Sequence, residues 1–198
     1  MKNNIFIAVI SLFVWFFIFA SVLYISWEEE VIDENDYSDL DSSSFYDLSV
    51  MSIDWWQIDF SDYKWKNLLL VNTASQCWYT YQYEWLQELH MQYSWDLQVI
   101  WFPSDNFAGQ EFEDDEDIQE FCDSTFWITF PLSTRIDVVW EDQHDIYNRL
   151  TNKEYNWLKD SEIEWNFQKY FVNREWELVD YFLSETEPMD DEILELIQ

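Results

Sequence analysis

The sequence NTASQCWYT, residues 72–80, decides the fold because it separates two stretches with different patterns. Before it, residues 68–71 form a short, continuous apolar run with polar residues on both sides, which is typical of a buried parallel strand. After it, residues 81–90 carry leucines at helical spacing. We therefore expect a strand, a loop that carries Cys77, and a helix.

Cys77 has two interpretations of equal weight when it is considered alone. Between a strand and a helix, backbone amides at the helix N-terminus can stabilise a thiolate, which is the nucleophilic form of the side chain. A lone cysteine can equally be a small buried apolar residue. The choice between a nucleophile and a core residue depends on the rest of the chain.

A second apolar run follows the helix at residues 97–102, which predicts a strand–helix–strand unit with a right-handed crossover. The remaining pattern predicts strands and helices in an α/β order. The expected elements are a hairpin at 50–60, a short helix at 117–122, a third strand at 136–139, a helix at 144–150, a hairpin formed by 167–171 and 177–182, and a closing helix at 190–197.

Three further stretches accompany residues 72–80 in a fixed order: WFPSDNFAGQE at 101–111, TFPL followed by RIDV at 129–138, and WNF at 165–167. Together the four stretches resemble the motifs of the glutathione peroxidase family, in its non-selenium, thioredoxin-dependent two-cysteine branch. The first has the family form N-x-A-S-x-C-G-x-T. The resemblance runs from about residue 52 to the C-terminus and implies a thioredoxin-like fold, with a mixed central sheet flanked by helices.

The resemblance also implies a catalytic set of Cys77, Gln110, Trp165 and Asn166. The thiolate would attack the peroxide and become a sulfenic acid. Amide and indole N–H groups are neutral donors that can stabilise the thiolate and orient the peroxide. Taken singly, Gln110 would be interpreted as a surface-loop residue and Trp165 as a core aromatic.

Cys122 is the second of the two cysteines and matches the family's resolving cysteine. It would attack the Cys77 sulfenic acid to form a disulfide, which a thioredoxin-like protein then reduces. A permanent structural disulfide is the alternative, because exported proteins often have one. In the family the two reduced cysteines lie apart, so we expect the helix that carries Cys122 to unfold locally.

The implied function is a peroxidase that reduces hydrogen peroxide or organic and lipid hydroperoxides in the response to oxidative stress. The alternatives are a peroxide sensor or redox relay, and an inactive thioredoxin-fold binding module. Glutathione is a less favoured reductant because it is an anion and the chain is very acidic, with a net charge of -32. We expect no cofactor and no metal, since His90 and His144 lack partner ligands at useful spacing.

The charge also argues against nucleic-acid binding, which normally needs a basic patch. Residues 5–26 are almost entirely apolar and follow Lys2, so residues 1–27 are expected to be a signal-anchor or a cleaved signal peptide. Residues 28–49 are expected to be an acidic flexible tether, and residues 50–198 the folded domain. The domain would lie outside the cytoplasm, anchored to a membrane or secreted.

The chain has one glycine and 14 tryptophans, which is far from the usual composition. Many tryptophans fall where the resembled family has glycine, and several of these positions are turns that favour a positive φ. They are Trp65, Trp78, Trp85, Trp101, Trp127, Trp140 and Trp176, with Trp55, Trp56, Trp95 and Trp157 as further members. Our hypothesis is that a codon such as UGA is read as glycine in the organism. The alternative is a genuinely tryptophan-rich protein.

Overall fold

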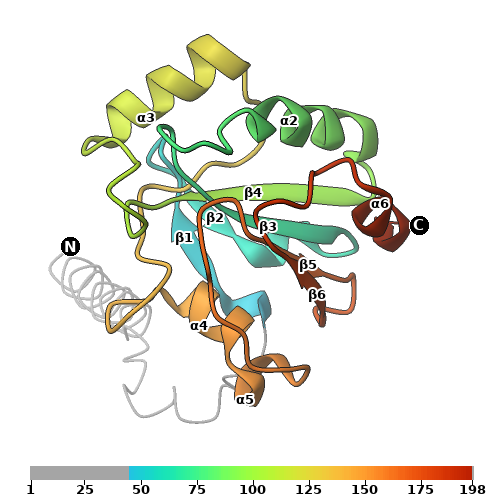
Figure 1. Ribbon diagram of the computed structural model, residues 1–198. Coiled ribbons are helices and arrows are strands. Elements are labelled where there is room, and N and C mark those ends of the chain that lie inside the picture. Colours follow the sequence, from blue (N-terminus) through green and yellow to red (C-terminus); the bar gives the residue numbers. More distant parts are fainter. Residues whose placement is uncertain (1–44, 198) are drawn as a thin grey trace, which may run out of the picture. The chain divides into compact units, whose positions relative to one another are not determined.

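A computed structural model describes residues 45–197 of the chain (Figure 1). The predicted membrane segment and residues 28–44 of the predicted tether lie outside this range. Within it, no helix is long and apolar enough to cross a membrane. Phe45 and Leu48, which we assigned to the tether, are buried in the core of the domain, so the packed structure begins before residue 50.

The centre of the domain is a four-stranded mixed sheet with the order β4-β3-β5-β6. β3 (Asn67–Thr73) pairs in parallel with β4 (Leu97–Pro103) and antiparallel with β5 (Lys169–Val172), which pairs antiparallel with β6 (Leu178–Phe182). Every residue of β3 and β4 is buried. Burial on both faces explains why these strands have continuous apolar runs in the sequence rather than alternation.

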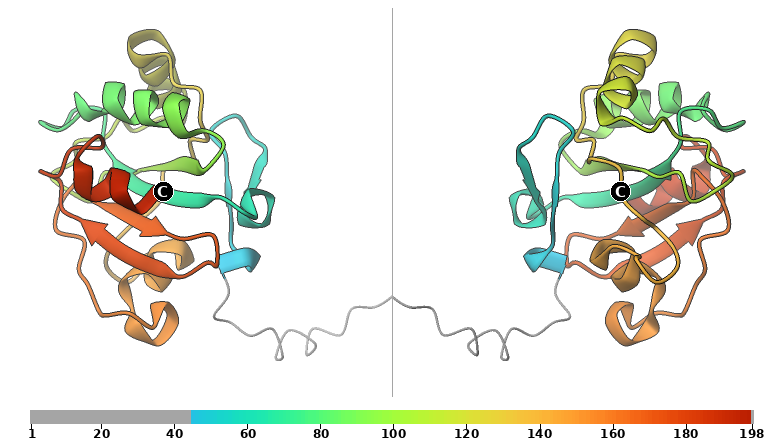
Figure 2. Two further views of the ribbon diagram at one scale, coloured as in Figure 1. Left: turned by 90° about the vertical axis from the view of Figure 1, so that its right-hand side faces the viewer. Right: turned by 90° about the vertical axis from the view of Figure 1, so that its left-hand side faces the viewer.

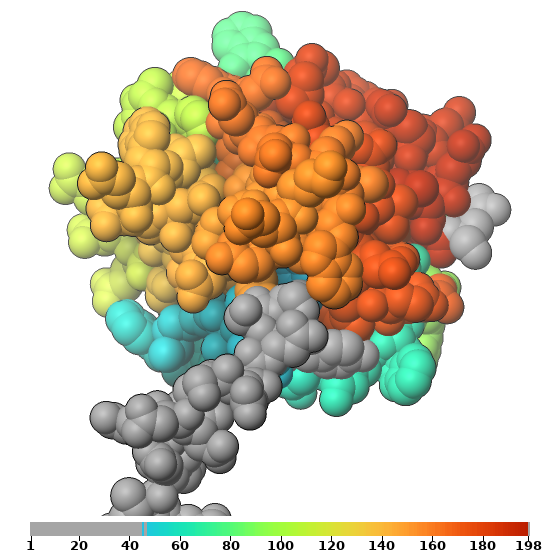
Figure 3. Space-filling view, turned by 90° about the horizontal axis from the view of Figure 1, so that it is seen from below, coloured from blue at the N-terminus to red at the C-terminus, as the bar shows by residue number. Residues whose placement is uncertain are grey.

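Helices cover both faces of the sheet (Figures 1 and 2). One core layer lies between the sheet and α2 (Gln82–Tyr93), α3 (Asp115–Phe121) and α6 (Asp191–Ile197). The opposite layer contains α4 (Asp145–Thr151), and the short helix α5 (Lys153–Asn156) follows directly. The orange segment that contains α4 and α5 forms much of the surface in Figure 3.

A small antiparallel hairpin and two 3-10 turns complete the second layer. The hairpin consists of β1 (Ser49–Met51) and β2 (Gln57–Asp59), with Val50 paired to Ile58. The turns η2 (Phe45–Asp47) and η3 (Phe60–Tyr63) precede and follow it. The side chains of Val50, Ile58 and Phe60 join the core with residues of α4. The hairpin therefore closes one face of the sheet.

The sequence predicted the central strands, the hairpins and the helices near their observed places, but the third strand at 136–139 was wrong. This segment has no strand, because its backbone donors are bound in other ways. The Ile136 N–H donates to the carbonyl oxygen of Pro103 (3.0 Å), and the Val138 N–H donates to Oδ1 of Asn106 (2.7 Å). The contact with β4 comes earlier, as a parallel bridge between Leu132 and Trp101.

Tryptophan is the main occupant of left-handed backbone positions in the described residues. Eight residues other than glycine have a positive φ, and six of them are tryptophans: Trp55, Trp65, Trp127, Trp140, Trp157 and Trp176. Trp127 ends the π-helical turn η4 (Cys122–Phe126), and Trp157 ends α5. The expectation that several of these tryptophans occupy turns with positive φ is confirmed. It does not extend to the five others, and one of these is fully buried in β4: Trp56, Trp78, Trp85, Trp95 and the buried Trp101.

Replacing Trp127 with glycine is expected to raise the free energy of unfolding by about 1 kcal/mol. The left-handed conformation costs an L-residue about 1–2 kcal/mol, and glycine offsets part of that gain by losing about 0.5–1 kcal/mol more backbone entropy. The side chain is 78% exposed, so little packing is lost. Urea unfolding measures the change.

The matched control is Trp95→Gly. Trp95 is 89% exposed and lies in a turn, but its φ is not positive. We therefore expect this variant to lose about 0.5–1 kcal/mol of stability from backbone entropy alone. Equal changes in the two variants would contradict the assignment of backbone strain to Trp127.

Candidate active site

Cys77 lies in the loop between β3 and α2 and is almost completely buried, with 8% of its surface exposed. The Tyr79 N–H donates to the Cys77 sulfur at 3.5 Å. The Thr80 hydroxyl accepts from the Cys77 N–H at 3.0 Å and lies 2.7 Å from the Cys77 carbonyl oxygen. Because α2 begins only at Gln82, the amide that contacts the sulfur belongs to the loop rather than to the helix itself.

The WNF segment, residues 165–167, is hydrogen-bonded to Asn72 near the end of β3. The Phe167 N–H donates to the carbonyl oxygen of Asn72 at 2.6 Å, and the Asn72 side-chain amide donates to the carbonyl oxygen of Trp165 at 3.0 Å. Phe167 takes a positive φ of 68°, which turns the chain at this point. The first and last of the four sequence motifs thus share one hydrogen-bonded unit.

Gln110 and Asn166 meet next to this unit. The Asn166 side-chain amide donates to Oε1 of Gln110 at 3.2 Å, and the Gln76 N–H, adjacent to Cys77, donates to the Gln110 carbonyl oxygen at 2.8 Å. Asn166 is fully buried, whereas Trp165 is partly exposed and lies 5.6 Å from the Phe107 ring, measured between ring centroids. The segments of all four predicted catalytic residues therefore come together around the Cys77 loop.

Cys122 is the first residue of η4, directly after α3, and is buried with a free thiol. Burial raises the pKa of this thiol far above its ordinary value, and the nearby carboxylates of Glu111 and Asp123 raise it further. The folded pocket therefore keeps Cys122 protonated. Cys77 also has a free thiol, so the structure corresponds to the reduced pair. The predicted unfolding around Cys122 stays a prediction.

Glu111 is a buried residue of the second motif that was not predicted to belong to the site. Its Oε1 accepts from the N–H groups of Ser75 (3.0 Å) and Phe112 (2.9 Å), which ties the loop after Gln110 to the Cys77 loop. Oε2 is buried with no hydrogen-bond partner. Burial raises the pKa of Glu111, and the hydrogen bonds from Ser75 and Phe112 oppose that rise. The position of Glu111 at the end of the second motif was the available signal.

Glu111→Gln is expected to remove a pH-dependent loss of stability. Because the folded-state pKa lies above the ordinary 4.5, Glu111 stabilises the fold most below pH 4.5 and loses this contribution as pH rises through its folded pKa. Within that window the stability of the parent protein should fall relative to the variant by at most about 1.4 kcal/mol per pH unit, the slope for release of one full proton. Glutamine keeps the acceptor for Ser75 and Phe112. Urea unfolding at several pH values tests this, and a difference that does not change with pH would contradict it.

A pocket of about 330 Å³ adjoins the Cys77 loop. It is lined by Tyr79, Glu164, Trp165, Leu183, Ser184 and Glu185. Cys77 does not line this pocket, and the link between the two is Tyr79, whose N–H donates to the Cys77 sulfur. A peroxide that enters it would meet the Trp165 side chain beside the loop.

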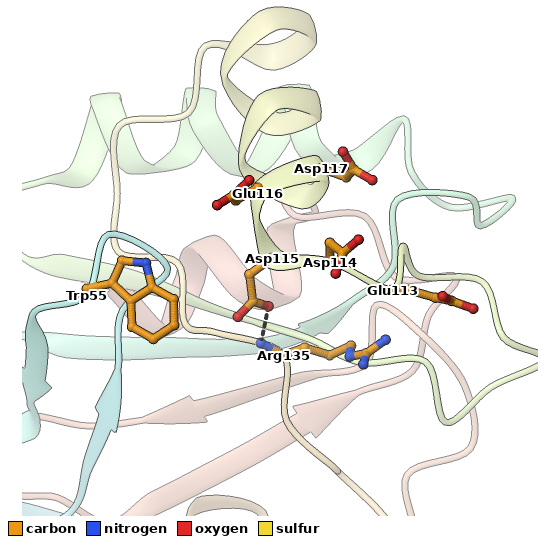
Figure 4. Close-up of a pocket in the computed structure, with 7 residues that line it drawn as sticks. All are labelled: Trp55, Glu113, Asp114, Asp115, Glu116, Asp117 and Arg135. Atoms are coloured by element: carbon orange, nitrogen blue, oxygen red, sulfur yellow. Dashed lines mark hydrogen bonds between the residues drawn. The ribbon is translucent and has the colours of Figure 1, made fainter.

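A separate pocket of about 530 Å³ lies at the start of α3 (Figure 4). It is surrounded by the acidic run Glu113–Asp117, with Trp55 and Arg135 on its other side. The Arg135 N–H donates to Oδ1 of Asp115 at 3.0 Å, and the Arg135 guanidinium donates to the Phe112 carbonyl oxygen at 3.1 Å. None of the predicted catalytic residues lines this pocket, so it is not the candidate site.

Comparisons with known proteins agree with this arrangement. Residues 45–151 match the family model for glutathione peroxidase. The chain is 34% identical over 157 residues to "Glutathione peroxidase" of Lactococcus lactis subsp. cremoris, covering 78% of this chain and 99% of the relative. It is 36% identical over 159 residues to "Glutathione peroxidase-like peroxiredoxin 2" of Saccharomyces cerevisiae, covering 79% and 98%.

Solved structures confirm the expected fold. The crystal structure of Trgpx in apo form has a TM-score of 0.59 and 31% identity, covering 78% of this chain and 95% of that chain. A thioredoxin family protein from Chlorobium tepidum has a TM-score of 0.54 at 11% identity, covering 76% and 93%, which supports the thioredoxin-like fold alone. With the matched family model and relatives above 30% identity across most of its length, the chain belongs to the glutathione peroxidase family.

Proposed function

We propose that the protein is a thiol peroxidase in which Cys77 reduces hydrogen peroxide or organic hydroperoxides. The observation that supports this most strongly is the hydrogen-bonded unit around Cys77. Gln110 accepts a hydrogen bond from the N–H of Gln76, the residue before the cysteine, and a second one from the Asn166 side chain. The Trp165 carbonyl oxygen accepts a hydrogen bond from the Asn72 side chain. Membership of the glutathione peroxidase family supports the same activity.

In the first step, the Cys77 thiolate attacks one oxygen of the peroxide. A sulfur–oxygen bond forms and the oxygen–oxygen bond breaks, so that Cys77 becomes a sulfenic acid and the second oxygen leaves as an alcohol or as water. The proton that the thiol releases ends on this leaving oxygen. The Tyr79 N–H is placed to stabilise the thiolate, and neutral donors at Gln110 and Trp165 are available to orient the peroxide.

In the second step, Cys122 attacks the sulfur of the Cys77 sulfenic acid. A disulfide forms and one molecule of water leaves, with the Cys122 proton and the sulfenic hydroxyl as its components. Cys122 is buried and held protonated, so the short helix α3 and the η4 turn must open before the thiol can ionise and reach Cys77. A dithiol protein of the thioredoxin type then reduces the disulfide by thiol exchange.

Peroxide consumption by the full chain, coupled to thioredoxin and its reductase, tests this proposal. We expect steady turnover with thioredoxin and much slower turnover with glutathione. A protein that consumes only one equivalent of peroxide and then passes its oxidation to another protein would instead be a peroxide relay. A protein that consumes none would be a binding module with a thioredoxin fold.

We also propose that residues 5–26 anchor this domain to a membrane, with the domain outside the cytoplasm. The support is the length and apolar character of that segment and the lysine that precedes it. In cells that express the full chain, the protein should stay in the membrane fraction after extraction at alkaline pH. Release of a shortened protein into the soluble fraction would indicate a cleaved signal peptide instead.

A further inference from the structure

The pocket that adjoins the Cys77 loop at Tyr79 has an acidic rim. Glu164 and Glu185 are exposed at its edge and come from segments on either side of the β5–β6 hairpin. No lysine or arginine of the described residues is among the six that line it. Two of the six residues that line this pocket therefore carry exposed carboxylates, and none carries a positive charge.

A buried lysine contacts the backbone of Ser184, one of the residues that line the pocket, and interacts electrostatically with Glu185. Lys169 is fully buried, and its Nζ donates to the carbonyl oxygens of Ser184 (3.3 Å) and Thr186 (2.5 Å). Burial lowers the pKa of Lys169 to about 7, against the opposing influence of Asp190, Glu185 and Glu187. At neutral pH this lysine carries only part of a charge, and its ammonium group is held by the two backbone oxygens.

We propose that Glu164 and Glu185 select uncharged peroxides and repel anionic ones. This inference rests on the proposed peroxidase function and assigns its substrate class. Carboxylates of one sign around an entrance change the local concentration and the association rate of charged substrates, and the effect decreases as salt is added. An uncharged alkyl hydroperoxide would enter freely, whereas a hydroperoxide with a free carboxylate would be repelled at the rim.

The test compares a fatty-acid hydroperoxide with its own methyl ester, two molecules that differ at one end by a single charge. The reduced full-chain protein is mixed with each, and the rate of Cys77 oxidation is followed in a single turnover without any reductant. At low salt we expect the ester to react about tenfold faster than the acid. The ratio should fall toward one in high salt, and also in the double variant Glu164→Gln with Glu185→Gln.

The control is the double variant Glu175→Gln with Glu177→Gln, which removes two exposed carboxylates from the β5–β6 turn, away from the pocket. It should keep the ratio of the parent protein. Equal rates for ester and acid in the parent, or a ratio that the rim variant leaves unchanged, would overturn the charge selection while the peroxidase function stands. Failure of both peroxides to oxidise Cys77 would overturn both proposals.

A second inference comes from the backbone and is independent of the chemistry. Of the six tryptophans with positive φ, five are 70–80% exposed: Trp55, Trp65, Trp127, Trp140 and Trp157. Their indoles therefore gain little from packing that could offset a strained backbone. The single glycine of the chain, Gly109, also has a positive φ, of 60°. A left-handed position with an exposed side chain is where glycine is the ordinary residue and a bulky residue an outlier.

We propose that the natural protein carries glycine at these five positions and at Trp176, because the cell reads their codon as glycine. The structure separates them from Trp101, whose ring stacks on Tyr83 with 4.1 Å between centroids inside the core. It also separates them from Trp165, which has no positive φ and lies in the WNF segment bonded to Asn72. Trp165 is therefore the internal reference for a codon that is read as tryptophan.

The gene and the protein isolated from its own organism provide the test. We expect the six positions to share one codon that differs from the codon of Trp165. Peptide mass spectrometry should find glycine at all six positions and tryptophan at Trp165. A single codon for all seven positions, or tryptophan as the main residue at the six positions, would overturn the inference.

Discussion

Replacing Cys77 with serine is expected to abolish peroxide reduction, with a fall in rate on the order of 10³-fold or more, as in other enzymes that lose their nucleophile. Serine keeps the size of the side chain and the hydrogen bonds of the loop, in which the Cys77 N–H donates to Thr80. What it removes is the sulfur, whose thiolate is a much stronger nucleophile toward peroxide oxygen than a serine hydroxyl. The measurement is the single-turnover rate with hydrogen peroxide.

Thermal unfolding of the same variant supplies the control. A serine in this small buried loop should leave the melting temperature within a few degrees of the parent, since the hydrogen bonds to Thr80 and Gln110 involve backbone atoms or other side chains. Peroxide reduction that survives in a folded Cys77→Ser protein would show that the chemistry takes place elsewhere, for example at Cys122.

Replacing Cys122 with serine is expected to separate the two steps of the cycle. The first equivalent of peroxide should react at nearly the parent rate, because no hydrogen bond within residues 45–197 joins the Cys122 thiol to the Cys77 loop. Turnover with thioredoxin should fall by about 100-fold or more, since no disulfide can form for thioredoxin to attack. Sulfenic acid on Cys77 would accumulate and can be captured with a dione reagent.

The opposite result is equally informative. Full turnover of Cys122→Ser with thioredoxin would mean that the reductant attacks the sulfenic acid directly and that Cys122 is structural. A variant that reacts slowly even with the first equivalent would show that Cys122 shapes the Cys77 pocket. Parallel measurements with Cys77→Ser distinguish these outcomes from a general loss of folding.

The sequence was sufficient to predict elements whose patterns are local. The continuous apolar runs of β3 and β4 and the leucines of α2 depend on burial, which has a direct counterpart in composition. Residues 136–139 failed because their apolar content resembles a strand, while their backbone donors are taken by Asn106 and Pro103. Both acceptors, one a side-chain oxygen and one a backbone carbonyl, lie more than thirty residues earlier in the chain, and no periodicity in the sequence indicates such contacts.

The candidate site, too, could be predicted only in part from the sequence. Cys77, Gln110, Trp165 and Asn166 were found through motif resemblance, and the structure brings their segments together. The role of Glu111 in joining two loops could not be predicted, because the sequence does not show that the N–H groups of Ser75 and Phe112 lie next to its carboxylate. The acidic rim of the pocket could not be predicted, because Glu164 precedes β5 and Glu185 follows β6. The two residues line one pocket only because β5 and β6 pair as an antiparallel hairpin.

The segment that carries Cys122 has a consequence for protease sensitivity. α3 has only seven residues, continues into a π-helical turn, and has acidic residues in its first turn with no basic residue in its last. A helix this short has little stability of its own and depends on its packing. Once a disulfide draws Cys122 away from its buried site, the chain between residues 113 and 127 should become a flexible loop. Limited proteolysis would then cut the oxidised protein in this segment and leave the reduced protein intact.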